Sequence, residues 1–269
     1  MSNWQRLLVT EEAGIVTVSL NRPDKLNALD IQLFKELDSV SQSLRKRKDI
    51  RAIILTGEGS NFSSGLDVKS VATSPGKVLG VLKKWMPGNA NLAQRVSRNW
   101  RRIPVPVIAA IEGRCYGGGM QIVLGADFRF ATPESELSIM EIRWGLVPDM
   151  AGLLSLRELV AKDVAMKLTM TGEIISGSRA QQLGLVTEIY DNPRQAAQVL
   201  AQQLCQASPD AIAAIKSTTT RSWSRSERYL LARETISQLR LILGKNFHIA
   251  GYRQRNKADK PYRQRQSFW

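Results

Sequence analysis

The stretch from Val107 to Ile122 reads Val-Ile-Ala-Ala-Ile-Glu-Gly-Arg-Cys-Tyr-Gly-Gly-Gly-Met-Gln-Ile. Its apolar start predicts a buried strand, which we expect over residues 105–111, and an apolar helix follows the three glycines 117–119. These glycines remove every side chain where a ligand could approach and leave backbone N–H groups at the helix start. Such groups can hold an oxyanion, although a tight strand-to-helix turn would explain the glycines equally well.

The elements on both sides of this stretch predict an α/β fold. Asp30 is expected to cap a helix after the first two strands, and the residues after position 193 read as helices only. We therefore divide the chain into an α/β core, residues 1–192, and a C-terminal helical region, residues 193–269. The basic end of that region, residues 252–269, is expected to be partly disordered or to pack across a neighbour. Strands are predicted over 6–10, 14–20, 50–56, 105–111, 128–131, 137–139 and 185–189.

The composition is that of an ordinary globular protein. The chain has 269 residues, of which 43% are hydrophobic and 23% are charged, which excludes a wholly disordered chain. No uncharged apolar run reaches the roughly 20 residues that a membrane helix needs. The N-terminus lacks the apolar core of a signal peptide, and two cysteines, Cys115 and Cys205, fit a reducing compartment. We therefore expect a cytoplasmic protein without a membrane span.

The scarcity of histidine restricts the chemistry. His248 is the only histidine of the sequence and lies near its C-terminal end. A Ser-His-Asp or Cys-His hydrolase would have to use it, and one histidine with two distant cysteines nearly excludes a histidine-based zinc site. We expect no metal, and we expect any acid–base catalysis to depend on carboxylates.

The charge is concentrated at one end of the chain. The net charge is +14, and residues 216–269 contribute 13 basic side chains against 3 acidic ones, a net +10. Such a surplus attracts polyanions, which include nucleic acid, an anionic membrane and a small ligand with several phosphates. A solvated basic surface without any specific partner explains the same surplus.

Two further segments carry candidate chemistry. Residues 62–69 (Phe-Ser-Ser-Gly-Leu-Asp-Val-Lys) form a second glycine-containing turn, which could supply another N–H group or could simply connect two elements. Residues 139–152 place Glu141 and Asp149 in a mostly apolar stretch. A carboxylate among apolar neighbours has a raised pKa and can act as a general base near neutral pH, whereas an ordinary salt bridge with Arg143 is the alternative.

Together these segments resemble the crotonase superfamily, the enoyl-CoA hydratase/isomerase family. Each motif alone is weak, but four of them in the family's order and spacing are specific, and they cover about residues 5–190. The resemblance implies a spiral of ββα units, a C-terminal helical region that forms a homotrimer or hexamer, and an acyl-CoA substrate. It implies no cofactor beyond the coenzyme A of the substrate. The matching motifs are residues 20–29 (Leu-Asn-Arg-Pro-Asp-Lys-Leu-Asn-Ala-Leu), 62–69, 108–119 and 141–148.

The resemblance also implies site residues. In this family two backbone N–H groups hold the thioester oxygen as it gains negative charge, and by position these belong to Leu66 and Gly118. The family's catalytic glutamate corresponds to Glu141. The positions that contact the nucleotide end of coenzyme A correspond to Lys25, Leu26, Asp67, Val68 and Lys69.

The sequence departs from the family's hydratases at one important position. Those hydratases use two glutamates to hold and split a water, and the first of them corresponds to Gln121 here. Glutamine can orient water but cannot take or give a proton near pH 7. Asp149 matches a position where the dienoyl-CoA isomerase branch carries a catalytic aspartate, although that branch also has an acid at the position of Gln121.

These residues favour an enzyme that forms a thioester enolate with Glu141 as acid and base. Shifting a double bond needs one carboxylate, whereas hydration normally needs a second acid or base, so isomerisation is slightly favoured over hydration. Two alternatives stay open. A weak or inactive acyl-CoA binder would follow from Gln121, and an RNA-binding protein on the same fold would follow from the basic C-terminal region.

Overall fold

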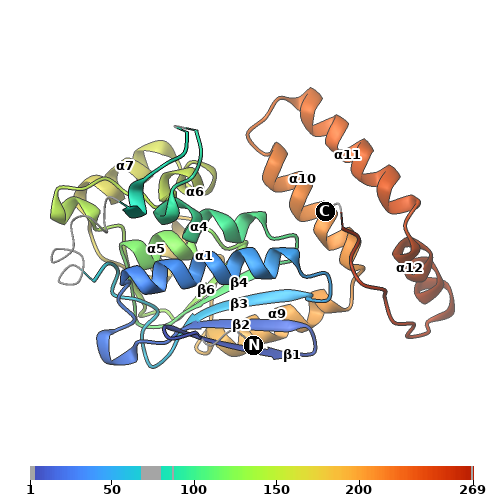
Figure 1. Cartoon of the computed structure of the whole chain (residues 1–269), viewed down its shortest axis with the longest axis horizontal. Coiled ribbons are helices and arrows are strands. Elements are labelled where there is room, and N and C mark those ends of the chain that lie inside the picture. The colour runs from blue at the N-terminus through green and yellow to red at the C-terminus, as the bar shows by residue number, and fades with distance from the viewer. Residues whose placement is uncertain (1–3, 68–79, 87, 268) are drawn as a thin grey trace.

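The computed structural model describes residues 4–67, 80–86, 88–267 and 269, and Figure 1 shows their arrangement. Val68 and Lys69, two of the residues expected at the coenzyme A nucleotide, lie outside the described residues. The strands are β1 (Leu7–Glu12), β2 (Ile15–Leu20), β3 (Ala52–Gly57), β4 (Val107–Ile111), β5 (Arg114–Tyr116), β6 (Phe128–Ala131), β7 (Glu136–Ser138), β8 (Ile175–Ser176) and β9 (Glu188–Ile189). The α-helices are α1 (Ile31–Lys46), α4 (Leu92–Arg102), α5 (Gly118–Val123), α6 (Gly152–Leu159), α7 (Lys162–Thr171), α8 (Gly177–Gln182), α9 (Pro193–Cys205), α10 (Pro209–Ser222), α11 (Glu227–Ile242) and α12 (Lys245–Asn256), and the 3₁₀ helices are η1 (Pro23–Lys25) and η2 (Glu141–Trp144).

The main sheet has the strand order β1-β2-β3-β4-β6-β9. β1 and β2 form an antiparallel hairpin, and the other neighbours pair in parallel. α1, α4 and α5 cover one face of this sheet and α9 covers the other, which gives the layered α/β fold that the sequence predicts (Figure 1). A smaller sheet, β5-β7-β8, lies beside the glycine triad.

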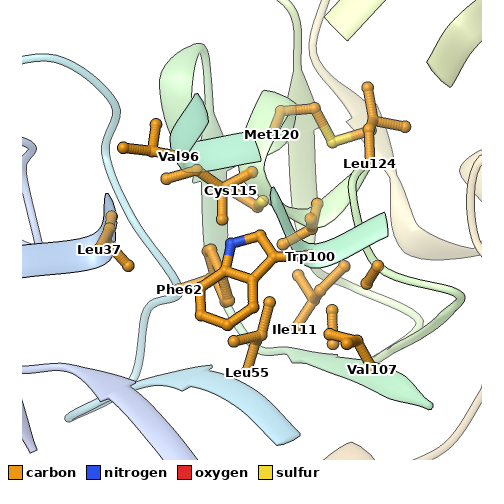
Figure 2. Close-up of a cluster of buried hydrophobic side chains, with 14 of the residues drawn as sticks. Leu37, Leu55, Phe62, Val96, Trp100, Val107, Ile111, Cys115, Met120 and Leu124 are labelled. Carbon is orange, nitrogen blue, oxygen red and sulfur yellow. The ribbon is translucent and has the colours of Figure 1, made fainter. Parts of the chain in front are cut away.

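A buried cluster around Trp100 holds the helices of the first layer on the sheet (Figure 2). The Trp100 side chain is fully buried, and within the described part of the chain its indole N–H has no hydrogen-bond partner. Because interiors are packed at crystal-like density, this cluster fixes α4 and α5 relative to β3 and β4. The cluster includes Leu37, Leu55, Phe62, Val96, Val107, Ile111, Cys115, Met120 and Leu124.

The helical region after residue 192 has two parts. α9 packs on the sheet through Ala197 and Ala201, whose small side chains are fully buried and allow a close approach to β3 and β4. α10 and α11 instead lie side by side and extend away from the sheet (Figure 1). In the described ranges no helix is both long enough and apolar enough to cross a membrane. The division of the chain at residues 192 and 193 stays a prediction.

Most predicted elements are confirmed with small shifts at their ends. The hairpin forms, and Asp30 caps α1 by accepting a hydrogen bond of 2.8 Å from the Leu33 N–H. The predicted strand over 185–189 is mostly wrong, since only β9 pairs with β6 and the N–H of Leu185 bonds back to the Ala180 carbonyl. β5 was not predicted, because three residues next to glycines carry no alternating pattern.

The C-terminal end of the chain is held by contacts with its own chain, which corrects the expectation of partial disorder. α12 extends to Asn256, and residues beyond it bond to α10, α12 and the end of α1. Packing across a neighbour stays a prediction. Asp210 is 1% exposed and accepts hydrogen bonds from Asn246 Nδ2 at 2.8 Å and from the Gln266 N–H at 2.7 Å. Arg265 is 4% exposed and donates to the Arg47 carbonyl at 2.7 Å. Hydrogen bonds of this kind hold the end of the chain, although Arg265 Nε is buried without a partner among the described residues.

Candidate active site

The glycine triad lies directly against the turn of residues 62–67. The Ser63 N–H donates to the Arg114 carbonyl and the Tyr116 N–H donates to the Ser63 carbonyl, both at 2.9 Å. Gly65 has a φ of +88°, and a Cβ atom there would lie 2.9 Å from the Tyr116 carbonyl oxygen. Gly119 would likewise bring a Cβ to 2.7 Å from Ser63 Cβ. Glycine is therefore required on both sides for the two segments to meet.

This contact brings the two predicted oxyanion donors into one site. Leu29 pairs with the second segment by donating to the Gly65 carbonyl and accepting from the Asp67 N–H, at 2.8 and 3.0 Å. In such a parallel bridge the N–H of Leu66 faces away from Leu29. Gly118 is the first residue of α5, where a backbone N–H has no intrahelical acceptor. Among the described residues we find no acceptor for either N–H.

Glu141 lies beside the same glycines. It begins η2, and its Oε1 would be 3.5 Å from a Cβ atom on Gly117. Gln121 Nε2 donates to that Oε1 at 2.6 Å. Glu141 Oε2 is buried and has no hydrogen-bond partner within the described part of the molecule. Burial raises the pKa of Glu141, and the nearby charge of Asp149 raises it further, while hydrogen bonds from its own backbone and from Gln121 lower it.

Gln121 is held in a single orientation. Its side chain is 1% exposed, and its Oε1 accepts from the N–H groups of Met150 and Gly152 at 2.9 and 3.0 Å. Because the amide oxygen is used by two backbone donors, the amide nitrogen must face Glu141. The sequence prediction left Gln121 as a group that could orient water. In this structure its side chain contacts the Glu141 carboxyl group through Nε2, and its role toward water stays a prediction.

Asp149 completes the acidic part of the site. The residue is solvent-exposed between buried Pro148 and Met150, yet partial burial of its carboxyl group raises the pKa of Asp149. Its negative charge raises the pKa of Glu141, as a like charge does. In the described part of the chain no group of three or more His, Cys, Asp and Glu side chains is placed to hold a metal ion.

The predicted coenzyme A contacts lie at the edge of the same turn. Lys25 and Leu26 are exposed at the end of η1, and Leu26 has a φ of +50°. Asp67 forms an ion pair of 3.2 Å with Arg22, whose Nη1 donates to the Ala28 carbonyl at 2.5 Å. These bonds tie the turn of residues 62–67 to the loop that carries Lys25.

Asn27 was missed as a residue that builds the site. It is fully buried at a φ of +54°, a conformation that asparagine tolerates better than most residues. Its Nδ2 donates to the carbonyls of Glu58 and Asn61 at 2.9 and 2.8 Å, and its Oδ1 accepts from the Arg22 N–H at 2.8 Å. Asn27 lies within the motif of residues 20–29 that carries the family resemblance. That motif does not show that the Asn27 side chain bonds to the carbonyls of Glu58 and Asn61.

Three comparisons with known proteins agree with this architecture. Residues 10–246 match the enoyl-CoA hydratase/isomerase family. The chain is 30% identical over 219 residues to the peroxisomal Delta(3,5)-Delta(2,4)-dienoyl-CoA isomerase of Arabidopsis thaliana, which covers 78% of this chain and 79% of that protein. It is 32% identical over 222 residues to carnitinyl-CoA dehydratase of Escherichia coli K12, with 79% of each chain covered.

The solved structures show the same fold over nearly the whole chain. The crystal structure of enoyl-CoA hydratase from Bacillus anthracis superposes with a TM-score of 0.88 at 25% identity, and covers 96% of this chain and 99% of that one. The enoyl-CoA hydratase of Mycobacterium tuberculosis H37Rv gives 0.84 at 27% identity, with 96% and 98% covered. The chain therefore belongs to the enoyl-CoA hydratase/isomerase family and has the crotonase-type α/β fold.

Proposed function

We propose that this hydratase/isomerase enzyme shifts a carbon–carbon double bond in an acyl-CoA thioester, with Glu141 as the base. Ionised Glu141 removes a proton from carbon 2 of a 3-enoyl thioester. The electron pair of that C–H bond moves toward the thioester oxygen, which becomes an enolate oxygen. The same carboxyl group then returns the proton to carbon 4, and the double bond ends between carbons 2 and 3.

The enolate needs donors that are in place before the reaction. The N–H groups of Leu66 and Gly118 take this role in the proposal, because they lie in adjoining segments and have no acceptor among the described residues. Loss of one such donor typically costs on the order of 10²–10³-fold in turnover. The nucleotide end of coenzyme A is assigned to Lys25, Leu26 and Asp67, and by resemblance alone to Val68 and Lys69.

One observation carries the choice of Glu141. Its carboxyl group lies beside the glycine triad with one oxygen fixed by Gln121 and the other buried without a partner. A buried oxygen without a hydrogen bond is energetically costly. A substrate C–H bond placed beside Glu141 Oε2 would give that oxygen a proton to accept. Gln121 cannot exchange a proton, so the arrangement supplies one base next to the glycines rather than a pair of glutamates. The relatives include both an isomerase and a dehydratase. Gln121 in place of a second acidic side chain favours isomerisation over hydration.

The reaction can be tested by product analysis. We expect the purified enzyme to convert a 3-enoyl-CoA to the 2-enoyl isomer at least tenfold faster than it hydrates a 2-enoyl-CoA of the same chain length. Proton NMR of the products distinguishes the two reactions. Faster hydration would contradict the proposal, and tight acyl-CoA binding without turnover of either substrate would instead select the inactive binder. RNA binding at physiological salt with neither activity would select the RNA-binding alternative.

The pH dependence follows from the raised pKa of Glu141. A base must be ionised, so kcat/KM should fall as the pH drops through the pKa of Glu141, which lies above the ordinary range of a glutamate. The Asp149→Asn change removes a negative charge that raises this pKa, so the acid limb should move to lower pH. Measurement of kcat/KM from pH 4 to pH 9 in both forms tests this. A limb that stays in place or moves to higher pH in the variant would contradict the assigned interaction.

The oligomer predicted from the sequence, a homotrimer or hexamer, stays part of this proposal. α10 and α11 leave large apolar side chains exposed, which is the surface expected of a subunit interface. Multi-angle light scattering at micromolar protein should therefore give three or six times the chain mass. A monomer under these conditions would contradict it. The exposed residues are Ile215, Trp223, Leu231, Ile236, Leu239, Ile242 and Leu243.

A further inference from the structure

A basic cavity of about 660 Å³ lies where the C-terminal ends of α4, α6 and α10 meet. Six arginines and Lys216 line it, and Glu158 is the one acidic side chain among the described residues that do so. None of the residues assigned to the reaction lines it. α6 separates the two places, since Gly152 at its start contacts Gln121 whereas Arg157 at its end faces the cavity.

Some of this positive charge is already neutralised. Lys216 Nζ forms an ion pair of 2.6 Å with Asp127 and donates to the carbonyls of Trp100 and Val105 at 3.0 and 2.8 Å. Arg101 forms an ion pair with Glu158, and Arg157 lies 3.8 Å from the same carboxyl group. Glu158 therefore cannot also compensate the remaining arginines of the cavity.

The remaining arginines of the cavity lack such partners. No carboxylate of the described residues lies within ion-pair distance of Arg98, Arg102, Arg221 or Arg225. Arg98, Arg102 and Arg221 line the same cavity. Burial lowers the pKa of Arg102, and the charges of Arg98, Arg45 and Arg221 lower it further. The three helix ends carry a partial charge of only about −0.5 each. Together they offset less than half of the charge of four arginines, so the cavity keeps a positive excess.

The other lining groups indicate what kind of anion fits. Thr220 and Ser224 supply hydroxyl groups, and Tyr229 and Trp269 supply aromatic rings. The guanidinium of Arg225 lies over the Tyr229 ring at 6.0 Å. The volume is that of a small-molecule site, since such sites usually measure about 300–1,000 Å³.

We propose that this basic cavity binds a small nucleotide with two or more phosphate groups, at a site separate from Glu141. The arginines at the ends of α4 and α10 contact the phosphates, because guanidinium groups bind phosphate oxygens in pairs. The aromatic rings contact the base. A free nucleotide polyphosphate and the nucleotide end of a second coenzyme A share this chemistry.

Isothermal titration calorimetry at physiological salt tests the proposal with two probes, adenosine 5′-triphosphate and adenosine 3′,5′-bisphosphate, each against adenosine alone. We expect at least one probe to bind and adenosine not to bind. The double variant Arg102→Glu/Arg221→Glu should weaken binding at least tenfold while isomerase turnover stays within twofold. The milder Arg102→Gln/Arg221→Gln should weaken binding at least threefold, which keeps the test valid if charge reversal disturbs folding. The probe that binds more tightly identifies which of the two ligand types the cavity prefers.

The control variant Lys48→Glu/Arg255→Glu makes the same change in net charge at exposed positions outside the cavity. It should alter the affinity by less than twofold. Equal weakening in the control would overturn the proposal, because binding would then follow net charge alone. Failure of both probes to bind at millimolar concentration would also overturn it. So would tight binding of a 20-nucleotide single-stranded RNA that the nucleotides do not displace, since the surface would then serve a nucleic acid.

Discussion

Replacement of Glu141 by Gln is expected to lower kcat on the order of 10²–10⁴-fold, the usual contribution of a positioned base. The substitution keeps the size of the side chain, and an amide oxygen at the same place could still accept from Gln121 Nε2. Acyl-CoA should therefore bind with an affinity within a few-fold of the unchanged enzyme. Stopped-flow absorbance with a 3-enoyl-CoA, together with calorimetric titration of the product, separates turnover from binding.

The matched control for this change is Glu134→Gln, because Glu134 is exposed and lies outside the site. It should leave both turnover and binding unchanged. The assignment of the base would be wrong if Glu141→Gln kept near-native activity while Asp149→Asn abolished it. Asp149 would then be the group that removes the proton.

Replacement of Gln121 by Glu is expected to raise hydration of a 2-enoyl-CoA on the order of 10²-fold, the contribution of one added acid or base. One oxygen of the new carboxyl group would keep the bonds from Met150 and Gly152. The other would replace Nε2 at 2.6 Å from Glu141 Oε1, where two ionised carboxylates repel strongly. The pair should therefore share one proton at neutral pH and supply both an acid and a base to water.

A second variant shows whether this gain comes from the new carboxyl group. Gln121→Met has a similar volume but cannot hold Glu141 or accept from the two backbone donors, so it should lose isomerase activity and gain no hydration. Product ratios by NMR report both reactions in one assay. Hydration that rises equally in both variants would show that loss of Gln121, rather than gain of an acid, causes the effect.

The sequence predicts the backbone of the site better than its hydrogen bonds. The glycines are recognisable in the sequence, and Gly65 and Gly119 permit the close approach of the two segments. Leu66 and Gly118 could be named in advance only through the resemblance to the family. Glu141 could be named from the resemblance. What stays hidden is pairing between residues distant in sequence, such as Gln121 with Met150 and Gly152, since periodicity reports burial and not partners.

In the C-terminal region, too, contacts between residues distant in sequence could not be predicted. α9, α10 and α11 could be predicted from their apolar spacing, but α12 and the docking of the chain end could not. Arg265 and Asp210 belong to residue types that are mostly exposed, yet both are buried here and form hydrogen bonds that no sequence pattern reports. The basic cavity is another case, because arginines from α4, α6 and α10 become neighbours only through the fold.

The central claim, that Glu141 alone removes and returns the proton, can be tested by isotope transfer. A 3-enoyl-CoA with deuterium at carbon 2 is incubated with the enzyme in ordinary water, and mass spectrometry of the earliest product measures deuterium at carbon 4. One buried carboxyl group predicts a measurable share of transferred deuterium, and product formation from Glu141→Gln that is slower on the order of 10²–10⁴-fold. Product formed at the full rate with no deuterium at carbon 4 would contradict the account, because two groups would then divide the removal and the return of the proton.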